Sequence, residues 1–213
     1  MNLSDSDIKK LRMAVRARLS EPRYLHTLGV EAAAVKIGKY CMPEALDELR
    51  AAALLHDVTK EMPISEQMDI LAQLDDVTED DLLSPSVYHS LTAPYVAKRD
   101  FSGFLSERIL SALKNHTTGA PDMSVFDQII FIADFVEETR AYGACIMARE
   151  KLYSALSVAK DSEECISLLH LSVIETLDFT IKYLVDKGKY LNGRTVAARN
   201  AFLGRFPKAL DKE

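Results

Sequence analysis

The stretch AALLHDVTK, residues 52–60, places a histidine and an aspartate directly after an apolar run. The alanines and leucines are typical of a helix that faces a core, yet His56 and Asp57 stand where that core should continue. Because an unpaired carboxylate costs several kcal/mol to bury, such a polar pair requires partners elsewhere in the chain. The rest of the sequence should therefore contain groups that meet His56 and Asp57.

The periodicity of the chain predicts an all-α protein. Apolar residues recur with helical spacing along nearly the whole length, and no alternating run between hairpin turns predicts a strand. The acidic segment LDDVTEDDLLSPS, residues 74–86, is expected to form an exposed loop, and Pro94 should kink its helix or mark a late start. The predicted helices cover residues 5–21, 22–40, 43–56, 65–74, 86–100, 105–115, 124–140, 144–160 and 162–187, followed by a short terminal helix within residues 187–203.

The composition is that of an ordinary globular protein. The chain has 213 residues, 48% hydrophobic and 27% charged, with no Gly- or Pro-rich linker, so one domain is expected over residues 1–213. The net charge of −6 is mixed along the chain, which argues against a nucleic-acid-binding groove. Cys41, Cys145 and Cys165 form no CxxC pair and predict core residues in a reducing compartment. With no apolar leader and no long apolar span, the protein is expected to be cytoplasmic and not bound to a membrane.

Four of the five histidines lie on core-facing stripes of the predicted helices. A single histidine on such a stripe is more often a hydrogen-bonded core residue than a metal ligand. Four of them together with Asp57 favour a shared site, whereas His170 has no such neighbours and is expected to be structural or on the surface. The four stripes pair His26 with Val30, His56 with Ala52, His89 with Ala93 and His116 with Ala112.

Asp134 is a sixth candidate because it lies within the apolar run IIFIADFV, residues 129–136. It could accept a hydrogen bond from a neighbouring helix, but a metal ion compensates a buried carboxylate more strongly. Four imidazoles and two carboxylates are about what two divalent ions need if Asp57 bridges them and water completes the coordination. The expected metal ligands are His26, His56, Asp57, His89, His116 and Asp134.

The order of these ligands resembles the HD-domain superfamily of metal-dependent phosphohydrolases, with its pattern of H, HD, H, H and D. The flanking segments ALLHDVTK (53–60), NHTTGAPDMSVFDQIIFIADFVEETR (115–140) and GRTVAARN (193–200) are similar to the YqeK family, the bacterial HD-domain symmetrical diadenosine tetraphosphatases. The resemblance runs from Arg23 to Asn200. Ser90, which follows His89, departs from the glycine or other small residue expected there.

The resemblance implies hydrolysis of diadenosine tetraphosphate to two ADP at an iron-containing dinuclear site. The HD metal-binding core would cover about residues 20–140, and a C-terminal helical extension about residues 141–213. Asp57 and Lys60 would act in catalysis, with Lys60 neutralising phosphate charge, and the Thr117, Thr118 and Gly119 run would contact phosphate oxygens. That run is equally readable as a helix stop.

Spacing adds two further cations to the expected site. Arg23 precedes His26 by one helical turn, and Arg140 closes the segment that contains Asp134, so both are candidate phosphate contacts. Lys60 and Arg140 are also ordinary cations for helix C-termini, where they complement the dipole. Asp127 is expected to form only a capping box with Ser124. For Glu137 and Glu138 solvated charges are expected, with contact of one of them behind the metal ligands as the alternative.

Alternatives stay open at the level of sequence. Another HD phosphohydrolase, acting on a nucleoside monophosphate, a deoxynucleoside triphosphate or a cyclic nucleotide, would share the ligand set, and a non-catalytic HD module could sense a nucleotide. Manganese, cobalt, nickel or zinc would suit these ligands as well as iron. The oligomeric state is also open, with a homodimer as one option.

Overall fold

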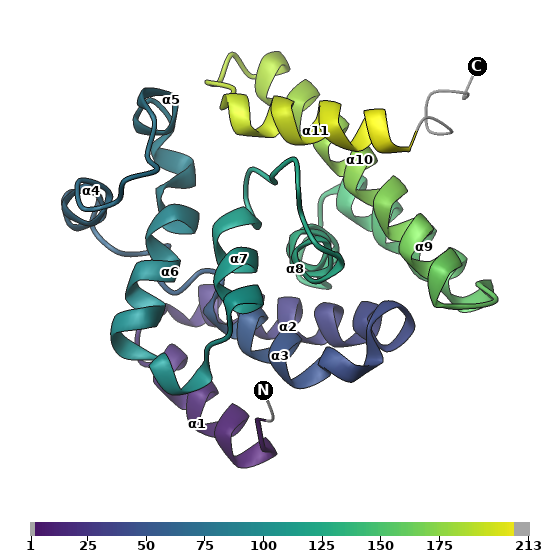
Figure 1. Cartoon of the computed structure of the whole chain (residues 1–213), viewed down its shortest axis with the longest axis horizontal. Coiled ribbons are helices and arrows are strands. Elements are labelled where there is room, and N and C mark those ends of the chain that lie inside the picture. Colours follow the sequence, from purple (N-terminus) through teal and green to yellow (C-terminus); the bar gives the residue numbers. More distant parts are fainter. Residues whose placement is uncertain (1–2, 207–213) are drawn as a thin grey trace.

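The computed structural model describes residues 3–206. This part of the chain contains α-helices, three short 3-10 turns and no strand (Figure 1), which confirms the all-α prediction. The helices are α1 (Asp5–Arg16), α2 (Glu21–Cys41), α3 (Leu46–Leu55), α4 (Ile64–Leu71), α5 (Glu79–Leu82), α6 (Tyr88–Asp100), α7 (Glu107–Asn115), α8 (Val125–Val136), α9 (Gly143–Val158), α10 (Ser162–Asp186) and α11 (Gly193–Arg205). The 3-10 turns η1 (Pro43–Ala45), η2 (Pro85–Val87) and η3 (Ser102–Phe104) precede α3, α6 and α7.

Helix α8 lies at the centre of the bundle. It is seen end-on in Figure 1, between α2 and α3 on one side, α7 on another, and α9 and α10 on a third, and it contacts all five. Its sequence is apolar on most faces because each face meets another helix. Phe126, Ile129 and Ile132 are fully buried, and each such side chain contributes roughly 1.5–3 kcal/mol relative to an exposed position. Asp134 is therefore carried by a helix that other helices hold in place on several sides.

The start of α8 agrees with the sequence prediction, and its end does not. Ser124 N donates to Asp127 Oδ2 at 2.9 Å and Asp127 N donates to Ser124 Oγ at 3.1 Å, which confirms the capping box. The predicted end near Arg140 is wrong, because the helix stops at Val136 and Glu137 is extended, with ψ of 154°. Instead, Arg149 Nε, on α9, donates a hydrogen bond of 2.6 Å to the carbonyl oxygen of Val136. A partner from another helix thus replaces the next turn of α8.

The prediction of an exposed loop over residues 74–86 is wrong at its centre. The segment contains α5, and the Asp81 side chain is 0% exposed. Arg194 donates to Asp81 from Nε at 2.8 Å and from Nη2 at 2.7 Å, and Asn192 Nδ2 donates at 3.1 Å. In Figure 1 the start of α11 reaches toward α5 across the top of the view. The partners lie more than a hundred residues away in the chain, so the local charge pattern did not reveal them.

Helices α9 and α10 pack against α8, and α11 packs against α10. None of the helices within residues 3–206 combines the length and apolar character that a membrane crossing requires. The division into a core of about residues 20–140 and a C-terminal extension stays a prediction.

The Asp81–Arg194 contact should depend on pH in a defined direction. Burial alone would raise the pKa of Asp81, but the Arg194 guanidinium and the neighbouring donors hold it well below the ordinary 3.8. Asp81→Asn is therefore expected to lower the free energy of unfolding by about 2 kcal/mol at neutral pH. Because the carboxylate must be charged to contribute, the difference should be complete above the ordinary Asp pKa of 3.8 and shrink as the pH falls from there toward the lowered pKa of the folded state.

Urea unfolding at several pH values measures this difference, and Glu79→Gln, at an exposed side chain of the same helix, is the matched control. An Asp81→Asn protein as stable as the control at neutral pH would contradict the prediction.

Candidate metal centre

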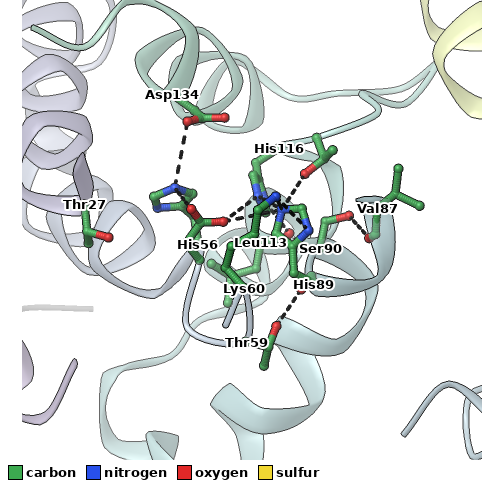
Figure 2. Close-up of polar contacts among 12 residues, drawn as sticks. Thr27, His56, Thr59, Lys60, Val87, His89, Ser90, Leu113, His116 and Asp134 are labelled. Carbon is green, nitrogen blue, oxygen red and sulfur yellow. Dashed lines mark hydrogen bonds and ion pairs between the residues drawn. The ribbon is translucent and has the colours of Figure 1, made fainter. Parts of the chain in front are cut away.

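The structure brings all six predicted metal ligands together beside α8. Figure 2 labels His56, His89, His116 and Asp134 within this cluster. The four imidazoles and Asp57 are buried, as the core-facing stripes predict, and Asp134 is partly buried. Two of the histidines, His56 and His116, stand at the C-terminal ends of their helices. His26 lies on α2, His56 ends α3, Asp57 follows in the next turn, His89 lies on α6, His116 ends α7 and Asp134 lies on α8.

Asp57 lies between two pairs of imidazoles. Its Oδ2 is 3.4 Å from His56 Nε2 and 3.6 Å from His26 Nε2. Its Oδ1 is 3.4 Å from His89 Nε2 and 3.8 Å from His116 Nε2. The two oxygens of one carboxylate therefore face different histidine pairs, which is the arrangement that a bridging ligand needs.

Asp134 belongs to the half of the cluster that contains His26. Its Oδ1 is 3.1 Å from His26 Nε2 and 4.0 Å from His56 Nε2. The His26–His56 half thus has a second carboxylate of its own. On the other half, Lys60 Nζ lies 3.2 Å from Nε2 and 3.3 Å from Nδ1 of His89.

Hydrogen bonds behind the rings decide which nitrogen faces the cluster. His56 Nδ1 lies 2.6 Å from the carbonyl oxygen of Ala53, and His116 Nδ1 lies 2.7 Å from that of Leu113. A carbonyl oxygen can only accept, so both Nδ1 atoms carry the hydrogen. In the neutral ring each Nε2 then points a lone pair into the cluster, as a metal ligand must.

The Nε2 atoms approach each other too closely to be left without a cation. His26 Nε2 and His56 Nε2 are 3.4 Å apart, and His89 Nε2 and His116 Nε2 are 3.2 Å apart. Two lone pairs at these distances repel unless a proton or a metal ion lies between them. In each of the groups His26–His56–Asp57 and Asp57–His89–His116, the ligand atoms lie within 4.8 Å of one another. This donor set of nitrogen and oxygen fits two divalent transition-metal ions.

The pKa values of His26 and Asp57 indicate that a metal ion would replace a proton in the cluster. Burial alone would lower the pKa of His26, but Asp134 and Glu137 raise it to about 9. Burial opposes ionisation of Asp57, yet the adjacent imidazoles hold its pKa well below the ordinary value. Without metal, His26 therefore keeps its proton and Asp57 its charge, whereas burial and the charge of Lys60 hold the pKa of His89 well below its ordinary value. Metal binding at His26 must release that proton.

Three cations surround the cluster. Arg23 Nη1 donates to Asp57 Oδ2 at 2.9 Å, and Arg140 Nη2 donates to Asp134 Oδ1 at 2.6 Å. Lys60 is the third, beside His89. A cleft of about 660 Å³, lined by Arg23, His26, Arg140 and Tyr142 among others, runs from the cluster to the surface. Arg23, Lys60 and Arg140 thus lie beside the cluster, and their contacts with phosphate stay predictions.

The Thr-Thr-Gly run divides between the site and the turn after α7. Thr117 Oγ1 lies 3.0 Å from His89 Nε2, at the cluster. Thr118 Oγ1 donates to the carbonyl of Gly119 at 3.0 Å. Gly119 has φ of +69°, and a Cβ there would lie 3.2 Å from the Cβ of Ala198. Thr118 and Gly119 therefore form the helix stop, and their phosphate contact stays a prediction.

One residue at the site was missed. Glu137 was expected to be solvated, but its side chain is 0% exposed and Oε1 lies 3.2 Å from His26 Nδ1. The error follows from the helix end, because the break after Val136 redirects Glu137 toward α2. A usable signal was Gly29 in the middle of a helix, where glycine costs about 1 kcal/mol and so marks a close approach.

Residues set aside in the sequence behave as expected. His170 is partly buried and packs on Phe206, with ring centroids 4.0 Å apart and the ring planes tilted by 34°, away from the cluster. Ser90 is buried and donates to the carbonyl of Val87 at 2.8 Å, so this departure from the family pattern is accommodated locally.

Comparisons with known proteins agree with this geometry. The model of the HD domain family matches residues 23–138. A symmetrical bis(5'-nucleosyl)-tetraphosphatase of Bacillus subtilis is 32% identical over 130 residues, which are 60% of this chain and 68% of the relative. Its namesake from Halalkalibacterium halodurans is 28% identical over 197 residues, 91% of this chain and 96% of the relative. The crystal structure of a predicted HD superfamily hydrolase involved in NAD metabolism, from Clostridium acetobutylicum, matches with a TM-score of 0.78 and 30% identity, covering 96% of this chain and 100% of that one.

The match to the HD domain and the buried histidine–aspartate cluster together identify this chain as a phosphohydrolase with a site able to hold metal. The chain belongs to the HD domain family and, within it, to the group of the relatives named symmetrical bis(5'-nucleosyl)-tetraphosphatase. The resemblance to the YqeK family, drawn from the motifs, is confirmed.

Substitution of Asp57 should affect both halves of the cluster. Asp57→Asn removes the charge that faces both imidazole pairs, so metal affinity is expected to fall by more than about 100-fold in both positions. His116→Ala removes a ligand from one half only and should leave close to one ion per chain. Elemental analysis after loading with Mn²⁺ and desalting measures both outcomes. An Asp57→Asn protein that retains two ions would contradict the bridging role.

Proposed function

We propose that this hydrolase cleaves diadenosine tetraphosphate symmetrically to two molecules of ADP. The observation that carries the proposal is the position of Asp57 between two imidazole pairs, with three cations around it. The relatives named for this activity match up to 92% of the chain, which supports the same substrate class. Iron, the location in the cytoplasm and the metal-ligand roles of the six residues belong to the proposal. The imidazole–carboxylate donor set and the three free, buried cysteines are consistent with it.

The substrate is a chain of phosphates, each of which repels an attacking hydroxide and an acidic protein. A pair of divalent ions, when bound, lowers the pKa of a coordinated water to near neutrality and neutralises phosphate oxygens. Side chains of the protein would hold these ions in place. Asp57 faces both metal positions, and the rings of His56 and His116 are fixed by their bonds to backbone carbonyls.

The cations supply contacts for phosphate oxygens. Arg23 and Arg140 stand at the inner end of the cleft, and each now donates to a carboxylate of the cluster. Their planar guanidinium groups can bind phosphate in a bidentate manner while keeping these contacts. Lys60 and the hydroxyl of Thr117 lie on the opposite half, beside His89. The phosphate chain would therefore cross the cluster from the arginines to Lys60.

The cleft has room for one nucleoside end of the substrate. Its volume of about 660 Å³ lies within the range of small-molecule sites. Tyr142 lines the cleft and is 74% exposed, so its ring is available to a planar base. Symmetrical cleavage needs an ADP unit held on one side of the reacting phosphate. A cleft lined by Arg23 and Arg140 together with Tyr142 offers cations for its phosphates and an aromatic ring for its base.

Product analysis tests the activity directly. The iron-loaded protein, incubated without oxygen with diadenosine tetraphosphate, is expected to give ADP as the sole nucleotide product on ion-exchange chromatography. AMP and dATP are the comparison substrates. Appearance of AMP with ATP would contradict symmetrical cleavage, and turnover of the comparison substrates alone would assign the site to another HD phosphohydrolase. Binding without any turnover would point to a nucleotide sensor.

Lys60 should matter for turnover and not for metal retention. Its ammonium contacts His89 but cannot coordinate a cation, so Lys60→Ala is expected to keep both ions while kcat falls roughly 100-fold. Lys182→Ala on α10 is a lysine control outside the cluster. Metal analysis and kcat are measured on the same preparation. Loss of metal in Lys60→Ala would contradict this division of roles.

A further inference from the structure

Glu137 is a buried carboxylate that the reaction does not use directly. It follows the last residue of α8 in an extended conformation, with φ of −62° and ψ of 154°. This conformation turns the side chain back toward α2, where it is 0% exposed. A carboxylate so placed needs donors on every side, because a buried charge without partners costs several kcal/mol.

All the partners of Glu137 are donors. Thr139 N donates to Oε2 at 2.6 Å, and Thr139 Oγ1 donates to Oε1 at 2.7 Å. The third partner is His26 Nδ1, 3.2 Å from Oε1. An ionised carboxylate accepts only, so the imidazole must present an N–H at Nδ1. Its Nε2, which lies 3.1 Å from Asp134 Oδ1, is then the atom aimed at the metal position.

The fold is built to admit this contact. Gly29 lies one turn after His26 on α2, and a Cβ at this position would come within 2.4 Å of Glu137 Oε2. Arg149, on α9, donates to the carbonyl oxygens of Val136 at 2.6 Å, Glu137 at 2.5 Å and Arg140 at 2.9 Å. The missing side chain of Gly29 leaves room for the Glu137 carboxylate, and Arg149 fixes the turn that carries Glu137, so the carboxylate lies against His26.

His26 needs a side-chain partner because of its place in its helix. His56 and His116 end their helices and use the carbonyl oxygen three residues earlier to hold Nδ1. His26 is interior to α2, where the backbone carbonyls are already engaged in the helix. Among the four cluster histidines, His26 is the one whose Nδ1 faces a carboxylate, and His89 has the ammonium of Lys60 beside it.

We propose that Glu137 is a positioning residue that holds His26 as the Nδ1–H tautomer and makes the His26–His56 half the tighter of two unequal metal positions. A carboxylate behind an imidazole orients the ring and strengthens it as a ligand, and its removal typically costs 10–100-fold in metal affinity. Asp134 adds a second charge to the same half. Arg23 and Arg140 also lie on this half, but each donates to a carboxylate that offsets its charge. On the other half, the ammonium of Lys60 lies directly beside His89 Nε2, where its positive charge opposes a cation.

Calorimetric titration of the metal-free protein with Mn²⁺ tests the proposal without any nucleotide, so its outcome is independent of the substrate. The wild-type protein should show two classes of site with unequal affinity. Glu137→Gln, which keeps the shape of the side chain, should weaken the tighter class about 10–100-fold and change the weaker class by less than about threefold. Glu150→Gln, at an exposed side chain of α9, is the matched control. His26→Ala identifies the class, since it should abolish the tighter one alone.

Gly29→Ala provides a second variant in case Glu137→Gln does not fold. Alanine suits a helix better than glycine by about 1 kcal/mol, while its Cβ would displace the Glu137 carboxylate. The same selective loss of the tighter class is expected, and the melting temperature of the metal-free protein checks that the variant is folded. Equal classes in the wild-type protein, an unchanged tighter class in both variants, or equal loss from both classes would overturn the proposal.

Discussion

A carboxylate buried between two pairs of imidazoles is stable only where positive charge lies beside it, and Asp57 is held in that position. The Nε2 atoms within each histidine pair lie 3.4 Å apart in His26–His56 and 3.2 Å apart in His89–His116. Their lone pairs repel each other unless a proton or a metal ion lies between them. Packing of α2, α3, α6, α7 and α8 forces these groups together. Burial energy of the helices therefore stabilises a cluster that is unfavourable by itself, and a metal ion or protons must complete it.

The way each histidine is aimed depends on where it stands in its helix. At the ends of α3 and α7, backbone carbonyls without a helical partner accept the Nδ1 hydrogen. These two orientations are thus local and need no distant residue. Inside α2 the backbone offers no such acceptor, so His26 is oriented by Glu137 from beyond α8. A site assembled from several helices combines both solutions, and only the second is sensitive to changes far away in the sequence.

The sequence predicted the helices and the cluster because both have local or repeated signals. Helical periodicity placed four histidines and Asp134 on apolar faces, and Ser124 with Asp127 announced the start of α8. The failures share one cause, a partner that is distant in the sequence. Glu137 was expected to be solvated, but α8 ends at Val136 and Glu137 contacts His26. Asp81 was expected to be exposed, but it is buried against Arg194. Spacing on one helix cannot report a charge supplied by another.

The charges at the site favour a polyanionic substrate only once metal is present. Three carboxylates contact the cluster or its ligands, and three cations lie beside them, so these side chains cancel when the imidazoles are neutral. The positive charge of two bound ions would then remain available to phosphate, which explains how an acidic protein can hold such a substrate. It also explains why the arginines stay in place while paired, ready to bind phosphate from the other side. The carboxylates are Asp57, Asp134 and Glu137, and the cations are Arg23, Lys60 and Arg140.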